Sequence, residues 1–194
     1  MKILRVNMST LETVLEDLPD DLKIVGGRGL SAKILAKEVP PESDPLGPEA
    51  KLVIAAGPLA GTMAPSCGRI SVGGKSPLTL GIKEANAGGP AAQKMDKLGV
   101  RAIIVEGQPE EGKLHLLSIN QDSASLVSAD QYKGMKNYEL AGALGKEYDE
   151  KATIISISIA GERKWKSAAV SLTDKDGHCS RHAARGGLGA VMGA

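Results

Sequence analysis

Aromatic residues are nearly absent from this 194-residue chain, which has no Phe, one Trp and three Tyr. Proteins that bind single-stranded nucleic acids usually stack the bases on aromatic side chains. The formal net charge is only +1, from 24 basic and 23 acidic residues, so the chain has no overall field to attract a polyanion. The composition argues against a nucleic-acid partner, and any ligand must be recognised locally.

Cysteine is scarce as well, since Cys67 and Cys179 are the only two in the sequence. Two cysteines cannot form a disulfide framework, and these two lack the close spacing that holds zinc or an iron–sulfur cluster. We interpret both as free thiols of a protein in a reducing compartment.

Long apolar runs are also missing. Residues 1–7 are short, mixed and strand-like, and no apolar run follows them, so we expect neither a signal peptide nor a membrane span. The sequence thus predicts a cytoplasmic protein without a membrane partner. It stops at residues 189–194 in a pattern of small apolar residues with no polar end, which favours the front part of a longer polypeptide.

Short aliphatic and β-branched runs predict strands, and amphipathic spacing predicts three helices. The expected strands are residues 2–6, 11–15, 51–56, 69–72, 102–105, 114–119, 124–127, 153–159 and 168–172. The expected helices are residues 30–39, 91–98 and 140–148, with Asn137 as an N-cap and Gly99 as a C-cap. His115 alternates with leucines, so we place it on the polar face of its strand, at the surface.

These elements predict one α+β domain over residues 1–194, with two mixed or antiparallel sheets and short helices. The order of parts hints at an internal duplication. An apolar strand ending in Ala56-Gly57 or Ala160-Gly161 precedes another strand and then a glycine-rich segment. We therefore expect a pseudo-twofold relation between the two halves.

Glycine is plentiful and concentrated in two segments that also carry arginine. The first glycine segment, residues 67–89, includes Arg69, and no Asp or Glu occurs between Gly57 and Ile82. The second glycine segment, residues 178–189, includes Arg181, and no acid follows Asp176.

Such segments are suited to binding oxyanions. Glycine lets a ligand approach the backbone, consecutive amides form concave anion sites, and arginine adds a fork of donors that matches phosphate. The alternative is that the glycines serve tight turns and the arginines are merely solvated. Because two segments of the same kind occur, we favour a shared anion site and predict Arg69 and Arg181 on one face.

Five motifs in and around these segments resemble the N-terminal domain of the tungsten-containing aldehyde ferredoxin oxidoreductases, in that family's order and over essentially the whole chain. They are Gly26-Gly27-Arg28-Gly29-Leu30, Ala55-Ala56-Gly57-Pro58-Leu59-Ala60-Gly61-Thr62, Lys75-Ser76-Pro77-Leu78-Thr79, Ala85-Asn86-Ala87-Gly88-Gly89 and Arg185-Gly186-Gly187-Leu188-Gly189-Ala190-Val191-Met192-Gly193. The resemblance implies a domain on which a tungsten or molybdenum bis-pterin cofactor rests, its metal held by four dithiolene sulfurs.

The resemblance also implies site residues. Arg69 and Arg181 would contact the pterin phosphates, and Gly88 would let the cofactor approach the chain. The backbone carbonyls of Asn86 and His182 would ligate a magnesium ion that bridges the two phosphates. No catalytic residue is implied in this domain, and Arg28 is interpreted as a surface residue at a helix start.

The chain departs from the commoner family pattern at the second glycine segment. That pattern places Arg-Ala-Ala-Gly-Arg-Gly-Gly directly after a histidine. Here Cys179 and Ser180 are inserted after His178, and His182 stands in place of an alanine. A backbone carbonyl does not depend on the side chain, so the magnesium role is retained, whereas the departure suggests a subfamily with a substrate other than a simple aldehyde.

By resemblance, the function is oxidation of an aldehyde to a carboxylic acid with ferredoxin as the electron acceptor. The catalytic groups and a [4Fe–4S] cluster would lie in C-terminal domains of the same protein, and a homo-oligomer would be compatible. One alternative is the tungsten subunit of an aromatic acyl-CoA reductase. Another is a non-catalytic phosphate- or nucleotide-binding module, although the chain lacks both a dinucleotide-binding glycine motif and a P-loop.

Overall fold

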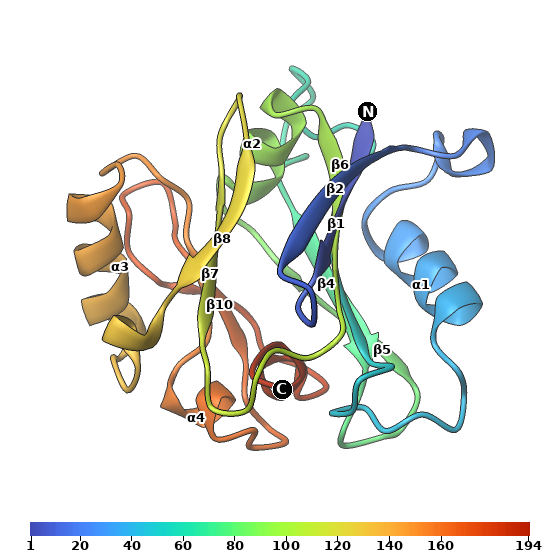
Figure 1. Cartoon of the computed structure of the whole chain (residues 1–194). Helices are drawn as coiled ribbons and strands as arrows, with labels where there is room; N and C mark the ends of the chain where they lie inside the picture. Colours follow the sequence, from blue (N-terminus) through green and yellow to red (C-terminus); the bar gives the residue numbers. More distant parts are fainter.

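A six-stranded mixed sheet forms the centre of the computed structural model, which describes all residues from 1 to 194 (Figure 1). In spatial order its strands are β2 (Glu12–Asp17), β1 (Lys2–Asn7), β6 (Val100–Glu106), β3 (Lys51–Ala56), β4 (Ile70–Lys75) and β5 (Ile82–Ala87). Neighbouring strands are antiparallel, except that β1 and β6 are parallel.

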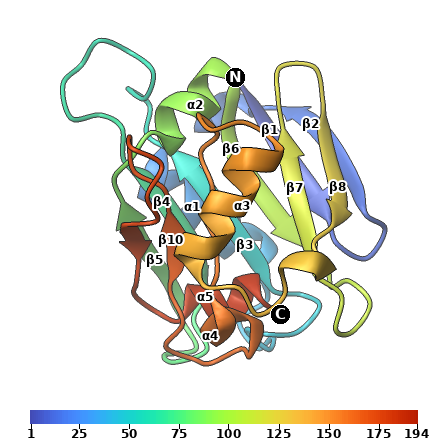
Figure 2. The same cartoon turned by 90° about the vertical axis from the view of Figure 1, so that its left-hand side faces the viewer.

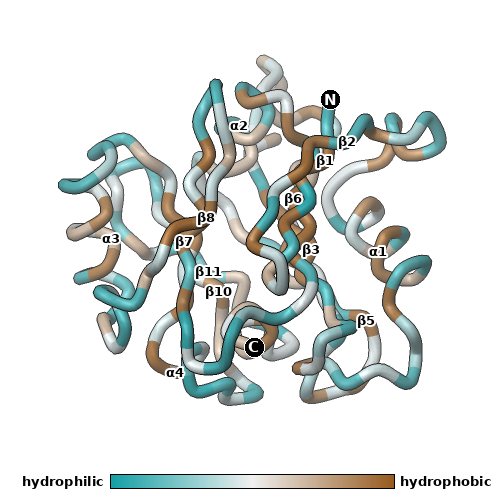
Figure 3. Tube along the Cα trace, viewed as in Figure 1, coloured by the Kyte–Doolittle hydropathy of each residue, from teal (hydrophilic) through white to brown (hydrophobic).

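The middle strands of this sheet are buried on both faces. Alternate residues of β3 contribute to two clusters, with Val53 and Ala55 facing helix α1 (Gly27–Glu38) and Leu52 and Ile54 facing the opposite layer. The hydropathy trace shows the same concentration of apolar residues along β1, β6 and β3 (Figure 3). A strand between two layers must be apolar throughout, which explains the uninterrupted run at residues 52–56.

The rest of the chain covers the face opposite α1 (Figure 2). It contains a hairpin of β7 (His115–Ile119) and β8 (Ala124–Ser128), and a three-stranded antiparallel sheet of β9 (Ile155–Ser156), β10 (Val170–Leu172) and β11 (Arg181–Ala183). The remaining helices are α2 (Ala91–Lys97), α3 (Asn137–Glu147), α4 (Ile159–Glu162) and α5 (Leu188–Met192). None of the helices has the length and apolar character needed to cross a membrane.

The two halves of the chain repeat one order of elements. A hairpin, a 3-10 turn and a helix come first, as β1, β2, η1 (Asp20–Leu22) and α1, and again as β7, β8, η2 (Asp130–Tyr132) and α3. Three strands and a helix follow, as β3, β4, β5 and α2, and again as β9, β10, β11 and α5, with α4 inserted between β9 and β10 in the second half. The sequence signal used to infer this duplication is wrong in one detail, because Ala160-Gly161 lies in α4 and does not end a strand.

The predicted α+β class, with its sheets and short helices, is confirmed, and a two-stranded hairpin sheet is present besides the two larger sheets. Strands β5 and β11 were not expected, because both lie in the glycine segments. Asn137 is the first residue of α3 and not its N-cap, which is Lys136. His115 is half-buried, with no partner for its buried Nδ1, so its placement at the surface is wrong.

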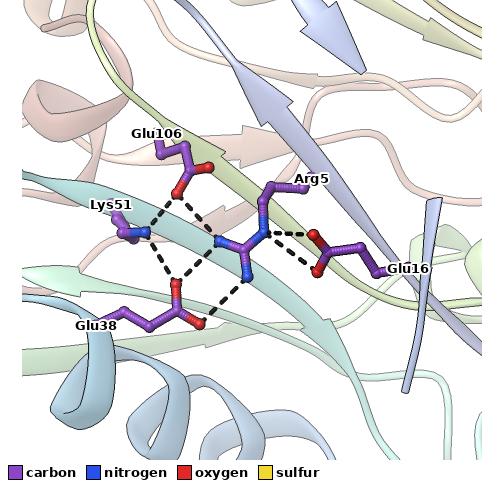
Figure 4. A network of polar contacts seen from close by, with 5 residues as sticks. All are labelled: Arg5, Glu16, Glu38, Lys51 and Glu106. Carbon is purple, nitrogen blue, oxygen red and sulfur yellow. Dashed lines mark hydrogen bonds and ion pairs between the residues drawn. The ribbon is translucent and has the colours of Figure 1, made fainter. Parts of the chain in front are cut away.

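Charged side chains at one end of the central sheet form a compact network around Arg5 (Figure 4). Its guanidinium Nη1 lies 2.9 Å from Glu38 and 3.1 Å from Glu106, and its Nε lies 3.2 Å from Glu16. Lys51 Nζ contacts Glu106 and lies 2.9 Å from Glu38. The network therefore joins β1, β2, β3, β6 and the last turn of α1.

Partial burial makes this network sensitive to pH. Burial acts to raise the pKa of Glu38, but hydrogen bonds from Arg5 and Lys51 outweigh it and hold that pKa below its ordinary value. A depressed carboxyl pKa contributes stability that is present above the ordinary value of 4.5 and is lost as the pH falls through the folded value. The network should thus weaken in acid.

We predict that Glu38→Gln lowers the free energy of unfolding by about 1–3 kcal/mol near neutral pH, because three charge-assisted hydrogen bonds, two from Arg5 and one from Lys51, are weakened. The difference from the wild type should shrink as the pH falls below about 4. Denaturant unfolding at several pH values measures both effects. Glu42→Gln is the control, since Glu42 is exposed and forms no ion pair. Equal pH dependence of wild type and Glu38→Gln would contradict the assignment.

Candidate functional site

Arg69 and Arg181 each lie close to one residue of a single dipeptide, Gly88-Gly89, just after β5. A Cβ built on Gly88 would lie 3.7 Å from Arg69 Nη1, and a Cβ built on Gly89 would lie 3.8 Å from Arg181 Cγ. The fold thus brings together two arginines from distant parts of the sequence, together with the glycine predicted to allow close approach.

The second glycine segment runs beside β5 in the opposite direction. Near the start of β5, a Cβ on Gly186 would lie 2.4 Å from Lys83 Cγ. Beyond its end, Gly89 is close to Arg181, and a Cβ there would lie only 2.9 Å from the Thr173 carbonyl oxygen. The two halves of the fold therefore meet along β5 and β11.

Asn86 and His182 occupy equivalent positions in the two halves. In strand pairing, Asn86 lies opposite Ser71, and His182 lies opposite Ser171. In each half a small apolar pair comes next, Ile70 with Ala87 and then Val170 with Ala183. The two predicted magnesium carbonyls thus belong to corresponding residues of strands that lie side by side.

The side chain of Arg69 is already oriented by Asn86. Its Nε donates to Asn86 Oδ1, and its Nη2 donates to the Asn86 backbone carbonyl over 3.3 Å. Arg69 therefore touches the very carbonyl predicted to face the metal. Asn86 Nδ2 in turn donates to Glu84 Oε1 over 3.4 Å, so a second residue of β5 supports the pair.

Arg69 and Arg181 are exposed cations that no carboxylate neutralises. Neither forms an ion pair in the structure. Arg28 differs, because its Nε lies 3.1 Å from Glu84 in a salt bridge on the surface. This contrast fits the interpretation of Arg28 as a surface residue, and it leaves two guanidinium groups free to contact an anion.

A small polar hollow adjoins Gly89 and Arg181, and the hairpin before β11 forms its far wall. Its lining residues are Gly89, Pro90, Gln93, Asp174, Lys175, Asp176 and Arg181. The acid-free character of the second glycine segment therefore does not extend to its surroundings in space. Asp174 is committed to the hairpin, because it accepts hydrogen bonds from the amides of Asp176 and His178 and from Ser180 Oγ.

The glycines of the second glycine segment pack against other parts of the fold and do not expose backbone to a ligand. A Cβ on Gly187 would lie 1.9 Å from the Lys166 carbonyl oxygen, and one on Gly189 would lie 2.5 Å from that of Ala169. Ser76 Oγ also donates to the Gly186 carbonyl over 2.7 Å. Gly187, the N-cap of α5, and Gly189, within α5, thus permit close packing of backbone on backbone.

The residues around Gly88 fit a bis-pterin with its phosphates and magnesium. The donor set is two unpaired guanidinium groups and two carbonyl oxygens, which are appropriate for phosphate and for a hard dication respectively. Because Gly88 has no side chain, the space beside Arg69 Nη1 that a Cβ would occupy stays open to a ligand. Arg69, Arg181 and Gly88 would hold the cofactor, and the carbonyls of Asn86 and His182 would hold the magnesium.

No group of three or more His, Cys, Asp and Glu side chains converges as metal ligands. Cys179 is buried, and burial raises the pKa of its thiol, while Cys67 is half-buried in a different loop. Both cysteines are free, as the sequence predicted.

Residues 3–194 match the sequence model described as aldehyde ferredoxin oxidoreductase, N-terminal domain. The chain belongs to the aldehyde ferredoxin oxidoreductase family. It is 44% identical over 195 residues to the tungsten-containing aldehyde ferredoxin oxidoreductase of Pyrococcus furiosus, and equally identical to that of Thermococcus kodakarensis. Each alignment covers 99% of this chain and 31% of the relative, so the chain spans less than a third of these proteins.

A solved structure extends the comparison to other members of this family. The fold matches a chain of the active site complex BamBC of benzoyl coenzyme A reductase, in complex with 1,5-dienoyl-CoA, with a TM-score of 0.88. The match has 36% sequence identity and covers 99% of this chain and 29% of the other. The fold of this chain is therefore shared with that chain over nearly the whole length of this chain.

Sequence reasoning missed the residues that contact Asn86 and His182, whose carbonyls are the predicted magnesium ligands. Ser171 and Glu84, which contact the side chains of His182 and Asn86, were not singled out. A signal for β5 was present, because polar Glu84 and Asn86 alternate with Ala85 and Ala87, which are buried. Strand β11 is only three residues long and carries no such signal.

The two roles of glycine can be separated by substitution. We predict that Gly187→Ala lowers the free energy of unfolding by at least about 2 kcal/mol, because its φ is +70° and a Cβ would collide with Lys166 backbone. Gly88→Ala should change stability by no more than about 0.5 kcal/mol, since its site is open. Chemical denaturation of both variants measures this, and equal stabilities would refute the distinction.

Proposed function

We propose that this domain holds the bis-pterin cofactor of a tungsten or molybdenum oxidoreductase. The observation that carries the proposal is the placement of two unpaired arginines, Arg69 and Arg181, beside the single dipeptide Gly88-Gly89. A doubly phosphorylated ligand has the size and charge to contact both groups at once. The family relatives named above are tungsten-containing enzymes, which supports this ligand over other polyanions.

Each residue contributes by binding and orienting. Arg69 and Arg181 neutralise phosphate charge, and Asn86 holds the Arg69 guanidinium in position through its side chain. The carbonyls of Asn86 and His182 provide oxygen ligands for magnesium between the two halves. The tungsten centre, when bound, supplies two-electron redox chemistry, while this chain provides the surface on which it rests.

For the full-length protein we propose oxidation of an aldehyde to a carboxylic acid in the cytoplasm, with ferredoxin as electron acceptor. C-terminal domains would supply the catalytic groups and a [4Fe–4S] cluster, and assembly as a homo-oligomer is compatible with this scheme. The isolated domain, residues 1–194, would be inactive. The names of the two archaeal relatives support the aldehyde substrate and the ferredoxin partner.

A second candidate is the tungsten subunit of an aromatic acyl-CoA reductase. The fold match to a benzoyl coenzyme A reductase complex favours keeping it. The higher sequence identity to the aldehyde enzymes favours the first candidate. A non-catalytic phosphate-binding module has less support, because these relatives are oxidoreductases.

Removing one anchor tests the site. We predict that Arg69→Ala in the full-length protein weakens cofactor retention about tenfold to a hundredfold, because a charge-assisted hydrogen bond to phosphate is lost. Asn86→Ala should lose less, since alanine keeps the carbonyl and only the support of Arg69 disappears. Tungsten or molybdenum per subunit, measured after dialysis, reports retention.

Arg163→Ala is the matched control, because Arg163 is also an exposed arginine but stacks over the Trp165 ring and contacts none of the site residues. It should keep the metal content of the wild type. Thermal unfolding of all three variants should stay close to the wild type, since an exposed arginine leaves no apolar cavity. Early unfolding of Arg69→Ala, with full metal content in the remaining folded protein, would show that Arg69 is structural.

We also predict that the 194-residue chain, purified anaerobically by itself, contains no iron–sulfur cluster and oxidises no aldehyde. A four-iron cluster ordinarily needs four thiolates, and this chain has two cysteines in separate places. Iron and acid-labile sulfide assays measure the cluster directly. Stoichiometric iron and sulfide in the monomer would contradict the prediction.

A further inference from the structure

A continuous chain of hydrogen bonds connects exposed His182 with buried Cys179 through three intervening side chains. His182 Nδ1 lies 3.0 Å from Ser171 Oγ, which lies 2.7 Å from Asn137 Nδ2. On the other side of the amide, Ser156 Oγ donates to Asn137 Oδ1 over 3.2 Å, and Cys179 Sγ lies 3.6 Å from Ser156 Oγ. Both serines and the cysteine are buried.

With the Asn137 amide oriented as in the structure, one assignment of donors satisfies every hydrogen bond in this series. Ser156 uses its single proton on Asn137 Oδ1, so the Cys179 thiol must donate to Ser156 Oγ. Burial raises the pKa of Cys179, which keeps that thiol protonated as the arrangement requires. At the other end, the Asn137 amide donates to Ser171 Oγ, and His182 Nδ1 is the only other partner of this buried hydroxyl, so we assign the serine proton to His182 Nδ1.

A nitrogen that accepts a hydrogen bond carries no proton, so the imidazole of His182 must hold its proton on Nε2. His182 is exposed, and its outer nitrogen is thus available as a donor to a ligand. The two ends of this chain are also the two departures from the family pattern, the inserted Cys179 and the histidine in place of alanine. One series of hydrogen bonds joins these two residues.

The pseudo-twofold relation places this imidazole at the proposed cofactor site. His182 corresponds to Asn86, whose side chain contacts Arg69. The position that corresponds to Arg69 in the second half is Ala169, one residue before the pair of Val170 and Ala183. The second half therefore lacks a guanidinium at that position, while a histidine donor stands where the first half has only an amide.

We propose that the imidazole of His182 is an additional hydrogen-bond donor to the phosphate-bearing cofactor, with Ser171 and Asn137 acting as positioning residues that fix the donor atom as Nε2. This inference rests on the proposed function for the identity of the ligand. It adds a side-chain contact at a residue to which the family pattern assigns only a carbonyl.

The first test is the tautomer of His182. In full-length protein labelled with ¹⁵N-histidine, at about pH 8.5 where an imidazole is neutral, the His182 ring should show the Nε2–H pattern. The signal is assigned by its loss in His182→Gln. Ser171→Ala should remove the tautomer preference. Cys67→Ala should leave it unchanged, because Cys67 takes no part in these hydrogen bonds. An Nδ1–H pattern in the wild type would overturn the proposal.

The second test is cofactor retention by the full-length protein during dialysis. We expect His182→Ala to lose tungsten pterin about twofold to tenfold faster than the wild type, in line with one neutral hydrogen bond. His182→Gln keeps a donor and should restore much of the retention. The control is His178→Ala, because His178 is exposed and lies outside the hydrogen-bonded chain.

The outcomes separate this inference from the proposed function. Wild-type protein that never contains tungsten or molybdenum pterin would refute the proposed function. Equal retention by wild type and His182→Ala, with Arg69→Ala still defective, would overturn only the role of His182. Faster loss from His182→Ala together with an unchanged thermal unfolding temperature would support it, since a purely structural role predicts that both change.

Discussion

The close approach of two backbone segments where the halves of the fold meet determines the geometry of the candidate site. A Cβ on Gly89 would lie 2.9 Å from the Thr173 carbonyl oxygen, and one on Gly186 would lie 2.4 Å from Lys83. Both glycines have positive φ, at +127° and +75°, which few other residues adopt. Without this contact, Arg69 and Arg181 would not lie beside the same dipeptide.

The same kind of packing explains why motifs far apart in the sequence occur together. A Cβ on Gly26, at the start of α1, would lie 2.8 Å from the Ala56 carbonyl oxygen at the end of β3. Ser76 Oγ, in the turn after β4, donates to the Gly186 carbonyl. The glycine motifs thus contact one another in the fold. Gly88, by contrast, leaves room for a ligand beside Arg69.

The two halves of the fold share backbone positions but differ in their side chains. Asn86 and His182 correspond, so two carbonyls can act alike even though their side chains differ. The arginines do not correspond, because Arg69 precedes β4 while Arg181 lies in β11. A cofactor with two similar halves needs similar backbone positions, whereas its phosphates can be contacted by side chains from different places. This asymmetry leaves room for subfamily differences such as the one at His182.

The sequence by itself determined the α+β class, the long strands and helices and the free cysteines, because these depend on local periodicity and residue chemistry, while family motifs supplied the residues of the candidate site as a prediction. The three residues of β11 carry no periodic signal, and the alternation that marks β5 lies inside a glycine segment. The sequence alone therefore did not reveal these two strands, whose pairing with neighbouring strands is a tertiary feature. Nor could it separate the packed Gly187 from the open Gly88, or connect His182 with Cys179. Those distinctions depend on what lies across the fold, and only tertiary contacts decide that.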